Sequence, residues 1–470
     1  MHNCSLAATR ERKIVSAIDS FIRRPRYIGL VSLLTLASSV FSLEIPLYFL
    51  FIAMGIYICL FSKDLLGLMP LTLSGYMSVS KKNNPGVYES TIFSADRWGI
   101  VIIGIAALLV IFLIWRLCTD DTIGKKAFLT KKRTLMPSLL ILGAAYCLGG
   151  LGTSADMKKN LVFALLQFAT LFVPYYVFSG GVDWKNCRRD YFCWIGFFTG
   201  LMLILQLVNI YRVNDILVNG IIDRDQIYNG WSTYNNFGMV LAMMIPCALY
   251  LASRHNKGWL GSIAAVIFLV GTFFSCSRNS ILMGCIAFTL SVLVSLSFAK
   301  NKRANFWALV IFLSLTTLFF LVHYDEIHRL FAILFDIGAD NNGRFITYRE
   351  GLKQFAKHPI FGSSFYPQGW QPFDWSTVDT FTNFFPPRWH NTIVQLLAST
   401  GIVGLATYLF HRARSAKIFM FNRTREKAFI ACMMLTLLGG SMLDCHFFNI
   451  GPVLFYSVGL AFAEFCVKTK

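Results

Sequence analysis

The chain has 470 residues, of which 56% are hydrophobic and only 14% are charged. Soluble globular chains carry about 25% charged residues and bury most of their large apolar side chains. The composition therefore excludes soluble enzymes, secreted disulfide scaffolds and disordered proteins, and it indicates an integral membrane protein. The formal charge of +19 is then expected to mark one side of the bilayer, and nucleic acid is not expected as a partner.

Apolar segments follow a polar, basic stretch at residues 1–27, which we expect to be a cytoplasmic N-terminus. Most are close to the length of about 20 residues that a helix needs to cross the hydrocarbon core. We therefore predict an all-α, polytopic protein with about 12–14 transmembrane helices, divided into a transmembrane part at 28–323 and a second one at 390–466. The expected segments are 28–43, 47–62, 98–115, 135–151, 160–178, 191–210, 234–252, 258–275, 279–298, 306–323, 391–410, 428–444 and 447–466, with Leu65–Ser80 as a marginal addition.

Basic residues concentrate in four of the connecting loops, at 116–134, 180–190, 299–305 and 411–427. All four fall on one side if the segments are counted as above, and cytoplasmic loops are the ones that carry excess Lys and Arg. We therefore expect both termini in the cytoplasm. A cytoplasmic N-terminus also favours a Leu65–Ser80 segment that crosses or re-enters the membrane.

A large polar loop at 324–389 is expected on the extracytoplasmic side. Within it, Arg344–Lys357 has apolar residues at helical spacing, which predicts an amphipathic helix at the membrane surface, and Pro359 ends that pattern. The segment Tyr366–Arg388 is rich in Trp, Phe and Pro. Its composition predicts an interfacial lid or a surface on which sugars stack.

Four polar signatures lie near the expected outer face. Each is common by itself, so only their order along the chain carries information. They are Tyr234-Asn235-Asn236-Phe237-Gly238, Ser275-Cys276-Ser277-Arg278-Asn279-Ser280, Asn342-Gly343-Arg344 continuing to His358-Pro359-Ile360-Phe361-Gly362, and Arg388-Trp389-His390-Asn391 before Gly401-Ile402-Val403-Gly404.

In this order, over roughly residues 190–410, the signatures resemble the O-antigen ligase and O-antigen polymerase superfamily. That pattern has an Asn opening a span, an SR pair, an Arg before an amphipathic helix, an HPxxG turn, and an HN pair before GxxG. This chain departs from it at Asn279, where a glycine is usual, and at Ser363, where the family often has another glycine. Neither departure changes a charged residue.

The resemblance implies a membrane glycosyltransferase of the bacterial inner membrane that acts in lipopolysaccharide or capsule synthesis. It would transfer a glycan from an undecaprenyl (polyprenyl) diphosphate carrier to a lipid or glycan acceptor on the outer leaflet. It would invert the anomeric centre and need no metal, nucleotide or other cofactor. Both a ligase, which uses a different acceptor, and a polymerase, which extends another lipid-linked repeat, fit the sequence.

The chemistry assigns roles to the residues of the motifs. An acceptor hydroxyl must lose a proton as it attacks, and a histidine that titrates near neutrality is suited to take it. Guanidinium groups match phosphate oxygens and stay charged. The expected catalytic residue is His390; the expected diphosphate-binding residues are Arg278, Arg344 and Arg388; and Asn236 and Asn391 are further candidates for substrate contact.

These residues also have structural interpretations. Arg278 is placed to reach lipid headgroups from the end of a span, and His390 to anchor an interface. Arg344 fits the start of a surface helix, although a cation there opposes the helix dipole. Arg388 is then a loop charge, and Asn236 orders a helix start.

Asp444 and His446 lie in the break between the last two apolar segments. They either line the cavity or form a structural pair, and the second interpretation is favoured.

The alternative function is a transporter or flippase of a lipid-linked saccharide or another solute, since 12–14 spans also suit that class. Many transporters show paired internal repeats and polar residues near the middle of the membrane. This sequence shows no such repeat, and its polar motifs gather near one face. A purely structural scaffold leaves the motif-bearing loop without a purpose.

Overall fold

The computed structural model describes residues 15–77, 108–116, 118–119, 132–153, 157–229, 232–255, 257–335, 344–366, 388–421 and 423–465. Over these ranges the chain is almost entirely helical. The strands are two short antiparallel pairs, β1 (Leu217–Val218) with β2 (Ile221–Ile222) and β3 (Tyr228–Asn229) with β4 (Ser232–Thr233). The predicted all-α class is confirmed.

In the described ranges, eight helices are long and apolar enough to cross a membrane, and four more apolar helices are shorter. The polytopic character expected from composition is therefore confirmed. The long helices are α3 (Glu44–Phe61), α8 (Met157–Gly181), α9 (Tyr191–Val213), α10 (Tyr234–Arg254), α12 (Arg278–Phe298), α13 (Lys302–Val322), α17 (Thr392–Met420) and α18 (Arg425–Leu443), and the shorter ones are α2 (Pro25–Phe41), α7 (Met136–Cys147), α11 (Trp259–Phe274) and α19 (Ile450–Phe465).

The marginal segment Leu65–Ser80 does not form a spanning helix in its described part. It gives only α4 (Leu68–Leu73) and the 3₁₀ turn η1 (Gly75–Met77), which are too short to cross. Most of its described side chains are nonetheless buried, and the Met77 carbonyl accepts a hydrogen bond from Gln206 within α9. Residues 78–107 and most of the aromatic segment Tyr366–Arg388 lie outside the described residues.

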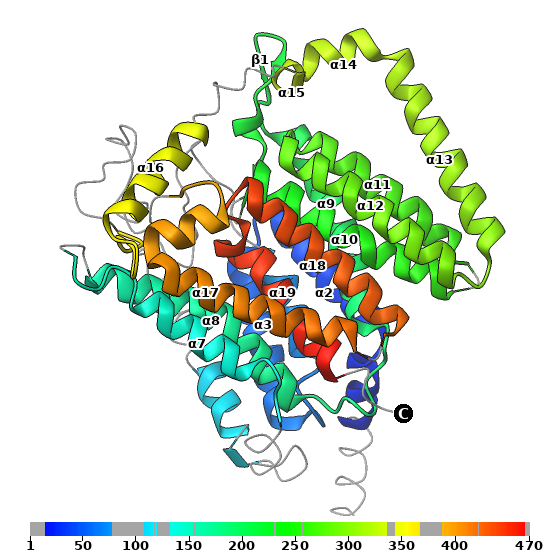
Figure 1. The fold of residues 1–470 in the computed structure, drawn as a ribbon. Helices are drawn as coiled ribbons and strands as arrows, with labels where there is room; N and C mark the ends of the chain where they lie inside the picture. The colour runs from blue at the N-terminus through cyan, green and yellow to red at the C-terminus, as the bar shows by residue number, and fades with distance from the viewer. Residues whose placement is uncertain are drawn as a thin grey trace, which may run out of the picture.

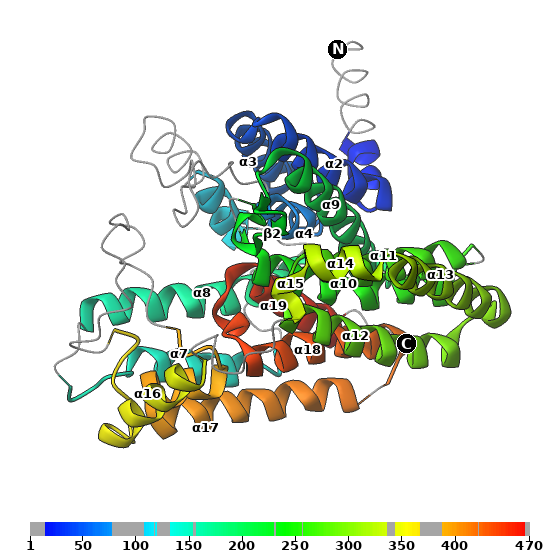
Figure 2. The same ribbon diagram turned by 90° about the horizontal axis from the view of Figure 1, so that it is seen from above.

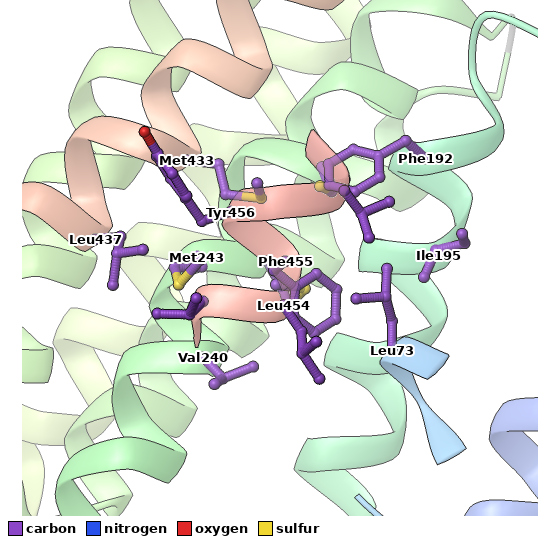
Figure 3. Close-up of a cluster of buried hydrophobic side chains, with 14 of the residues drawn as sticks. Leu73, Phe192, Ile195, Val240, Met243, Met433, Leu437, Leu454, Phe455 and Tyr456 are labelled. Carbon is purple, nitrogen blue, oxygen red and sulfur yellow. The ribbon is translucent and has the colours of Figure 1, made fainter. Parts of the chain in front are cut away.

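Helix α10 is the centre of the bundle. It packs against α9, α11, α12 and α18 (Figure 1), and 94% of its most apolar 18-residue window is buried. The apolar cluster in Figure 3 joins it to its neighbours, with Val240 and Met243 facing α18 and α19. The same cluster reaches Leu73 of α4, so the short helix is fastened to the core.

The bundle has two ends with different chemistry. At the motif end, α10, α12 and α17 begin and the connection from α18 to α19 turns. At the basic end, α10 and α12 finish; Arg254 there lies 3.5 Å from Glu426 and the Lys300 N–H donates to the Ser253 carbonyl (3.3 Å). The ends of helices thus separate the motif residues from the arginine- and lysine-rich connections.

Helix α13 is the least embedded of the long helices, with 11% of its most apolar window buried. It contacts the bundle mainly along α11 and stands apart from it toward its own end (Figures 1 and 2). From there α14 (Tyr324–Leu330) and α15 (Ala332–Phe335) return to the motif end beside β2.

Helix α16 (Arg344–Lys357) occupies the residues expected for the amphipathic helix and lies against the first part of α17 (Figures 1 and 2). Gly351 makes this contact possible: a Cβ there would lie 2.6 Å from Val394 and 3.2 Å from the Trp389 ring. Only glycine lets the two helices approach so closely.

Candidate active site

His390 lies on a tight turn just before α17. Trp389 is buried at one side of the turn, and its N–H donates to Gln395 Oε1 (3.0 Å). At the other side, Asn391 caps α17 by accepting from the backbone N–H groups of Ile393 and Val394. His390 itself has φ +49°, which only a strongly constrained non-glycine residue adopts. The contacts of Trp389 and Asn391 therefore hold His390 in an unfavourable backbone conformation, which fixes the direction of its imidazole.

Asp444 holds the His390 imidazole. His390 Nδ1 lies 3.2 Å from Asp444 Oδ1, and the same oxygen accepts the N–H of Cys445 (2.7 Å). Burial alone would raise the pKa of the Asp444 carboxyl, but the hydrogen bonds from His390 and from the Cys445 N–H lower it below its usual range. The ionised carboxylate accepts only, so His390 Nδ1 carries the hydrogen and Nε2 presents a lone pair.

The two partners differ in exposure: the His390 side chain is 38% exposed and that of Asp444 is 8% exposed. Among the described residues, no group forms a hydrogen bond with His390 Nε2. A third contact, from the Tyr348 hydroxyl of α16 to the His390 carbonyl (3.1 Å), fixes the backbone. The arrangement is that of an oriented, accessible base backed by a buried acid.

A chain of hydrogen bonds runs inward from Arg388, two residues before His390. Arg388 Nη1 donates to Asn449 Oδ1, and Asn449 Nδ2 donates to Asn236 Oδ1. Asn236 Oδ1 also faces His446 Nδ1 (3.1 Å), and His446 Nε2 lies 3.1 Å from Asn279 Nδ2. The motif that opens α10 is thus joined to the connection between α18 and α19.

The direction of each hydrogen bond in this chain, from donor to acceptor, can be assigned in only one consistent way. Arginine cannot accept, so Asn449 must present its oxygen to Arg388 and its NH₂ to Asn236. Asn279 Nδ2 donates to the Gly440 carbonyl (3.0 Å), which fixes that amide as well. His446 must then donate from Nδ1 and accept at Nε2, and it is held as the neutral imidazole.

Electrostatics favour the same state of His446. Burial lowers its pKa to about 4, and the positive charges of Arg388 and Arg344 contribute while Asp444 opposes them. The charge of Arg344, the first residue of α16, is therefore close enough to His446 to lower the pKa of that histidine. A glycine at position 279 would leave Nε2 without a donor, so Asn279 is the partner that makes a buried histidine acceptable here.

Arg278 has a different neighbour. Its Nε donates to the Leu334 carbonyl (3.2 Å) and its Nη2 to the Ile333 carbonyl (2.6 Å), so it holds the end of α15. The residues around it are built into the fold: Ser277 caps α12 and donates to Asn235 Oδ1 (2.8 Å), and Gly238 leaves space for Ser275 and Ser280. The first two signatures therefore pack on each other.

The HPxxG and GxxG signatures form one structural unit. Helix α17 is broken at Gly401 (φ +65°), and the turn after α16 fills the break. The Ile402 N–H donates to the Pro359 carbonyl (2.9 Å), and the Ser363 N–H donates to the Ala398 carbonyl (2.7 Å). A Cβ on Gly362 would lie 2.4 Å from the Ser399 backbone. These glycines serve the docking of α16 near His390, and their role is structural.

The structure brings His390, Arg388, Asn236 and Asn391 together at the motif end and directs the charge of Arg344 toward them. The Asn391 amide is engaged on both sides, since its Nδ2 donates to the Met442 carbonyl (2.7 Å). Arg278 instead faces α15.

The sequence interpretation favoured a structural pair at Asp444 and His446 and left out Asn449. In the structure Asp444 contacts His390, and His446 contacts Asn236, Asn279 and Asn449. A signal was present: three hydrogen-bonding side chains interrupt an otherwise apolar run over six residues, from Asp444 to Asn449.

Residues 263–409 match the O-antigen ligase family. The matched region begins within α11, ends within α17 and contains Arg278, Arg344, Arg388 and His390. This O-antigen ligase domain, together with the apolar helices, supports a multi-pass membrane enzyme of the O-antigen ligase and polymerase type, acting in polysaccharide biosynthesis.

Asn236 precedes the matched residues and Asp444, His446 and Asn449 follow them, whereas Asn279 and Tyr348 lie within the match. The comparison with curated proteins finds no match.

Proposed function

We propose that the protein transfers a glycan from a polyprenyl diphosphate carrier to an acceptor hydroxyl, with His390 as general base. The observation that supports this most is the His390–Asp444 pair, whose accessible Nε2 lies at the same end of the bundle as the arginines of the O-antigen ligase domain. A proton acceptor and several permanent cations in one place suit a reaction that removes a proton and releases a diphosphate.

In the proposed step, His390 Nε2 takes the proton of the acceptor hydroxyl as that oxygen attacks the anomeric carbon. The bond from this carbon to the phosphate oxygen breaks, and its electron pair leaves with the polyprenyl diphosphate. A single displacement inverts the anomeric centre. Asp444 stabilises the imidazolium that forms, because its buried carboxylate lies 3.2 Å from Nδ1.

Arg388 and Arg344 are proposed to face the departing diphosphate. Asn449 positions the Arg388 guanidinium and occupies one of its two terminal nitrogens, so the remaining donors can serve phosphate oxygens. Arg278 is proposed to join them by exchanging the α15 carbonyls for phosphate oxygens. Its contribution to donor binding would therefore depend on a displacement of α15.

We propose that the motif end faces the periplasmic side of the bacterial inner membrane, with both termini in the cytoplasm. The support is the distribution of charge, since the loops at 180–190, 299–305 and 411–427 belong to the opposite, basic end. Undecaprenyl diphosphate-linked glycans are then the donor class.

The test is transfer by the purified protein from a polyprenyl-diphosphate oligosaccharide, in EDTA and without nucleotide. We expect His390→Ala to lose about 10²–10⁴-fold in rate while retaining its elution profile. His358→Ala is the matched control, because the half-buried side chain of this second histidine near α16 forms no hydrogen bond or ion pair with the described residues. Normal transfer by His390→Ala would remove His390 as the base.

The products of the same assay separate the two versions of the function. Longer lipid-linked chains without an added acceptor would identify a polymerase. Transfer that requires a separate lipid or glycan acceptor would identify a ligase.

A further inference from the structure

A positively charged hollow lies at the basic end of the bundle, at the far end of α10 from the candidate active site. It has a volume of about 460 Å³ and is lined by Arg254, His255, Lys257 and Lys300. Arg254 is the last residue of α10, His255 and Lys257 come from the connection between α10 and α11, and Lys300 comes from the connection between α12 and α13. Its lining contains no carboxylate.

The nearest acids are already neutralised by other groups. Asp190 is 1% exposed, and Arg188 donates to both of its carboxylate oxygens (3.0 and 2.9 Å). Arg254 divides its charge between Asp190 (3.9 Å) and Glu426 (3.5 Å). In the part of the chain that the structure describes, Lys257 and Lys300 form no ion pair, so the hollow carries uncompensated positive charge.

The backbone holds these cations together. The Ser253 carbonyl, in the last turn of α10, accepts both the Lys300 N–H (3.3 Å) and Arg425 Nη1 (3.3 Å). The end of α10, the connection between α12 and α13 and the start of α18 therefore meet at one carbonyl. His255 Nε2 is buried 3.8 Å from Asp190 Oδ2 and forms no hydrogen bond in the described structure, so the cations left for a ligand are those of Lys257 and Lys300.

Large exposed apolar side chains lie within three residues of Lys257 and Lys300 in the chain. Trp259 is 41% exposed and Leu260 49% at the start of α11, and Phe298 is 43% exposed at the end of α12. An exposed tryptophan beside cations is typical of the level at which lipid headgroups meet the hydrocarbon core. A free phosphate would use the cations alone, whereas an anionic phospholipid uses both features.

We propose that this hollow binds the phosphate of an anionic phospholipid of the leaflet at the basic end. Lys257 and Lys300 contact the phosphate oxygens, and the acyl chains lie along Trp259, Leu260 and Phe298. The site is separate from the glycan-transfer chemistry and does not depend on it. It would fasten the connections of α10 and α12 to the membrane surface.

The experiment counts bound lipids by native mass spectrometry after the purified protein is stripped in neutral detergent and titrated with phosphatidylglycerol. Parallel titrations use phosphatidylcholine and inorganic phosphate. The double variant Lys257→Gln/Lys300→Gln should bind phosphatidylglycerol about 25-fold more weakly, since each lysine near an anionic lipid contributes roughly fivefold.

The matched control, Lys185→Gln/Lys417→Gln, removes two exposed lysines of the same end that do not line the hollow. It should bind phosphatidylglycerol as the wild type does, and Lys257→Arg/Lys300→Arg should restore binding. Equal loss in both glutamine pairs would overturn a specific site in favour of general surface charge. Equal binding of phosphatidylcholine would overturn the anionic preference, and saturation by inorganic phosphate without lipid would overturn the lipid as the ligand.

Discussion

Replacing Asp444 by Asn isolates the contribution of its charge. Both contacts of the carboxylate, with His390 Nδ1 (3.2 Å) and with the Cys445 N–H (2.7 Å), use Oδ1. An asparagine oxygen in the same place can accept both hydrogens. The His390 tautomer and ring position are therefore retained, and only the negative charge is lost.

The separation of the two groups gives the expected magnitude. At 3.2 Å, a pair of unit charges is worth about 1 kcal/mol in water and about 5 kcal/mol at an effective dielectric constant of about 20. Because the His390 side chain is 38% exposed, solvent screens the pair and a value of about 1.5–3 kcal/mol is expected for the developing imidazolium. That corresponds to a rate reduced by about 10- to 100-fold.

The assay is glycan transfer with purified Asp444→Asn protein, with kcat and KM measured separately for the donor. The loss should fall in kcat, because the charge acts on a species present only in the transition state. Asp444→Ala should lose more, since it also leaves the Cys445 N–H without its acceptor. A kcat for Asp444→Asn within twofold of wild type would refute the proposed role of the pair.

Three further outcomes are expected. Gly401→Ala should lower the melting temperature through a loss of about 1–3 kcal/mol, because its Cβ would lie 2.3 Å from the Ile360 carbonyl oxygen; Gly220→Ala, with a similar φ and open surroundings, should lose less. His446 has its pKa lowered to about 4, so the neutral imidazole contributes fully to the stability of the folded protein above pH 6.5. About 2 kcal/mol of the free energy of unfolding should be lost between pH 7 and pH 5, and the melting temperature should fall with it. The variant His446→Gln, which keeps a donor and an acceptor, should reduce this dependence of the melting temperature on pH. Arg388→Lys should raise the KM for the donor about tenfold, since one ammonium cannot serve Asn449 and a phosphate in a forked geometry; an unchanged KM would contradict its contact with the diphosphate.

The membrane class and most helix positions follow from the sequence because a run of apolar residues in lipid has few alternatives to a helix. The amphipathic pattern also gave α16 its observed limits, Arg344–Lys357. Predictions failed where hydropathy carries less information. The predicted span at 391–410 is shorter than α17, because the helix continues to Met420 through the charged residues Arg412, Arg414 and Lys417.

Pairing across the bundle is what sequence alone could not supply. Asp444 lies 54 residues from His390 in the chain, and only the packing of α17 beside α18 brings them together. The same limit applies to Arg278, whose motif suggests phosphate while its contacts are the carbonyls of α15. The local pattern identified residue types, and tertiary contacts decided which of them meet.

The hydrogen-bond chain from Arg388 through Asn449, Asn236 and His446 to Asn279 has a consequence for proton traffic. Its hydrogens have a single permitted arrangement, and three of its members are amides, which do not readily exchange protons along a chain. This chain of hydrogen bonds therefore does not carry protons away from His390 into the interior. In the proposed reaction, a proton taken up by His390 would leave from the exposed side of the ring, toward water.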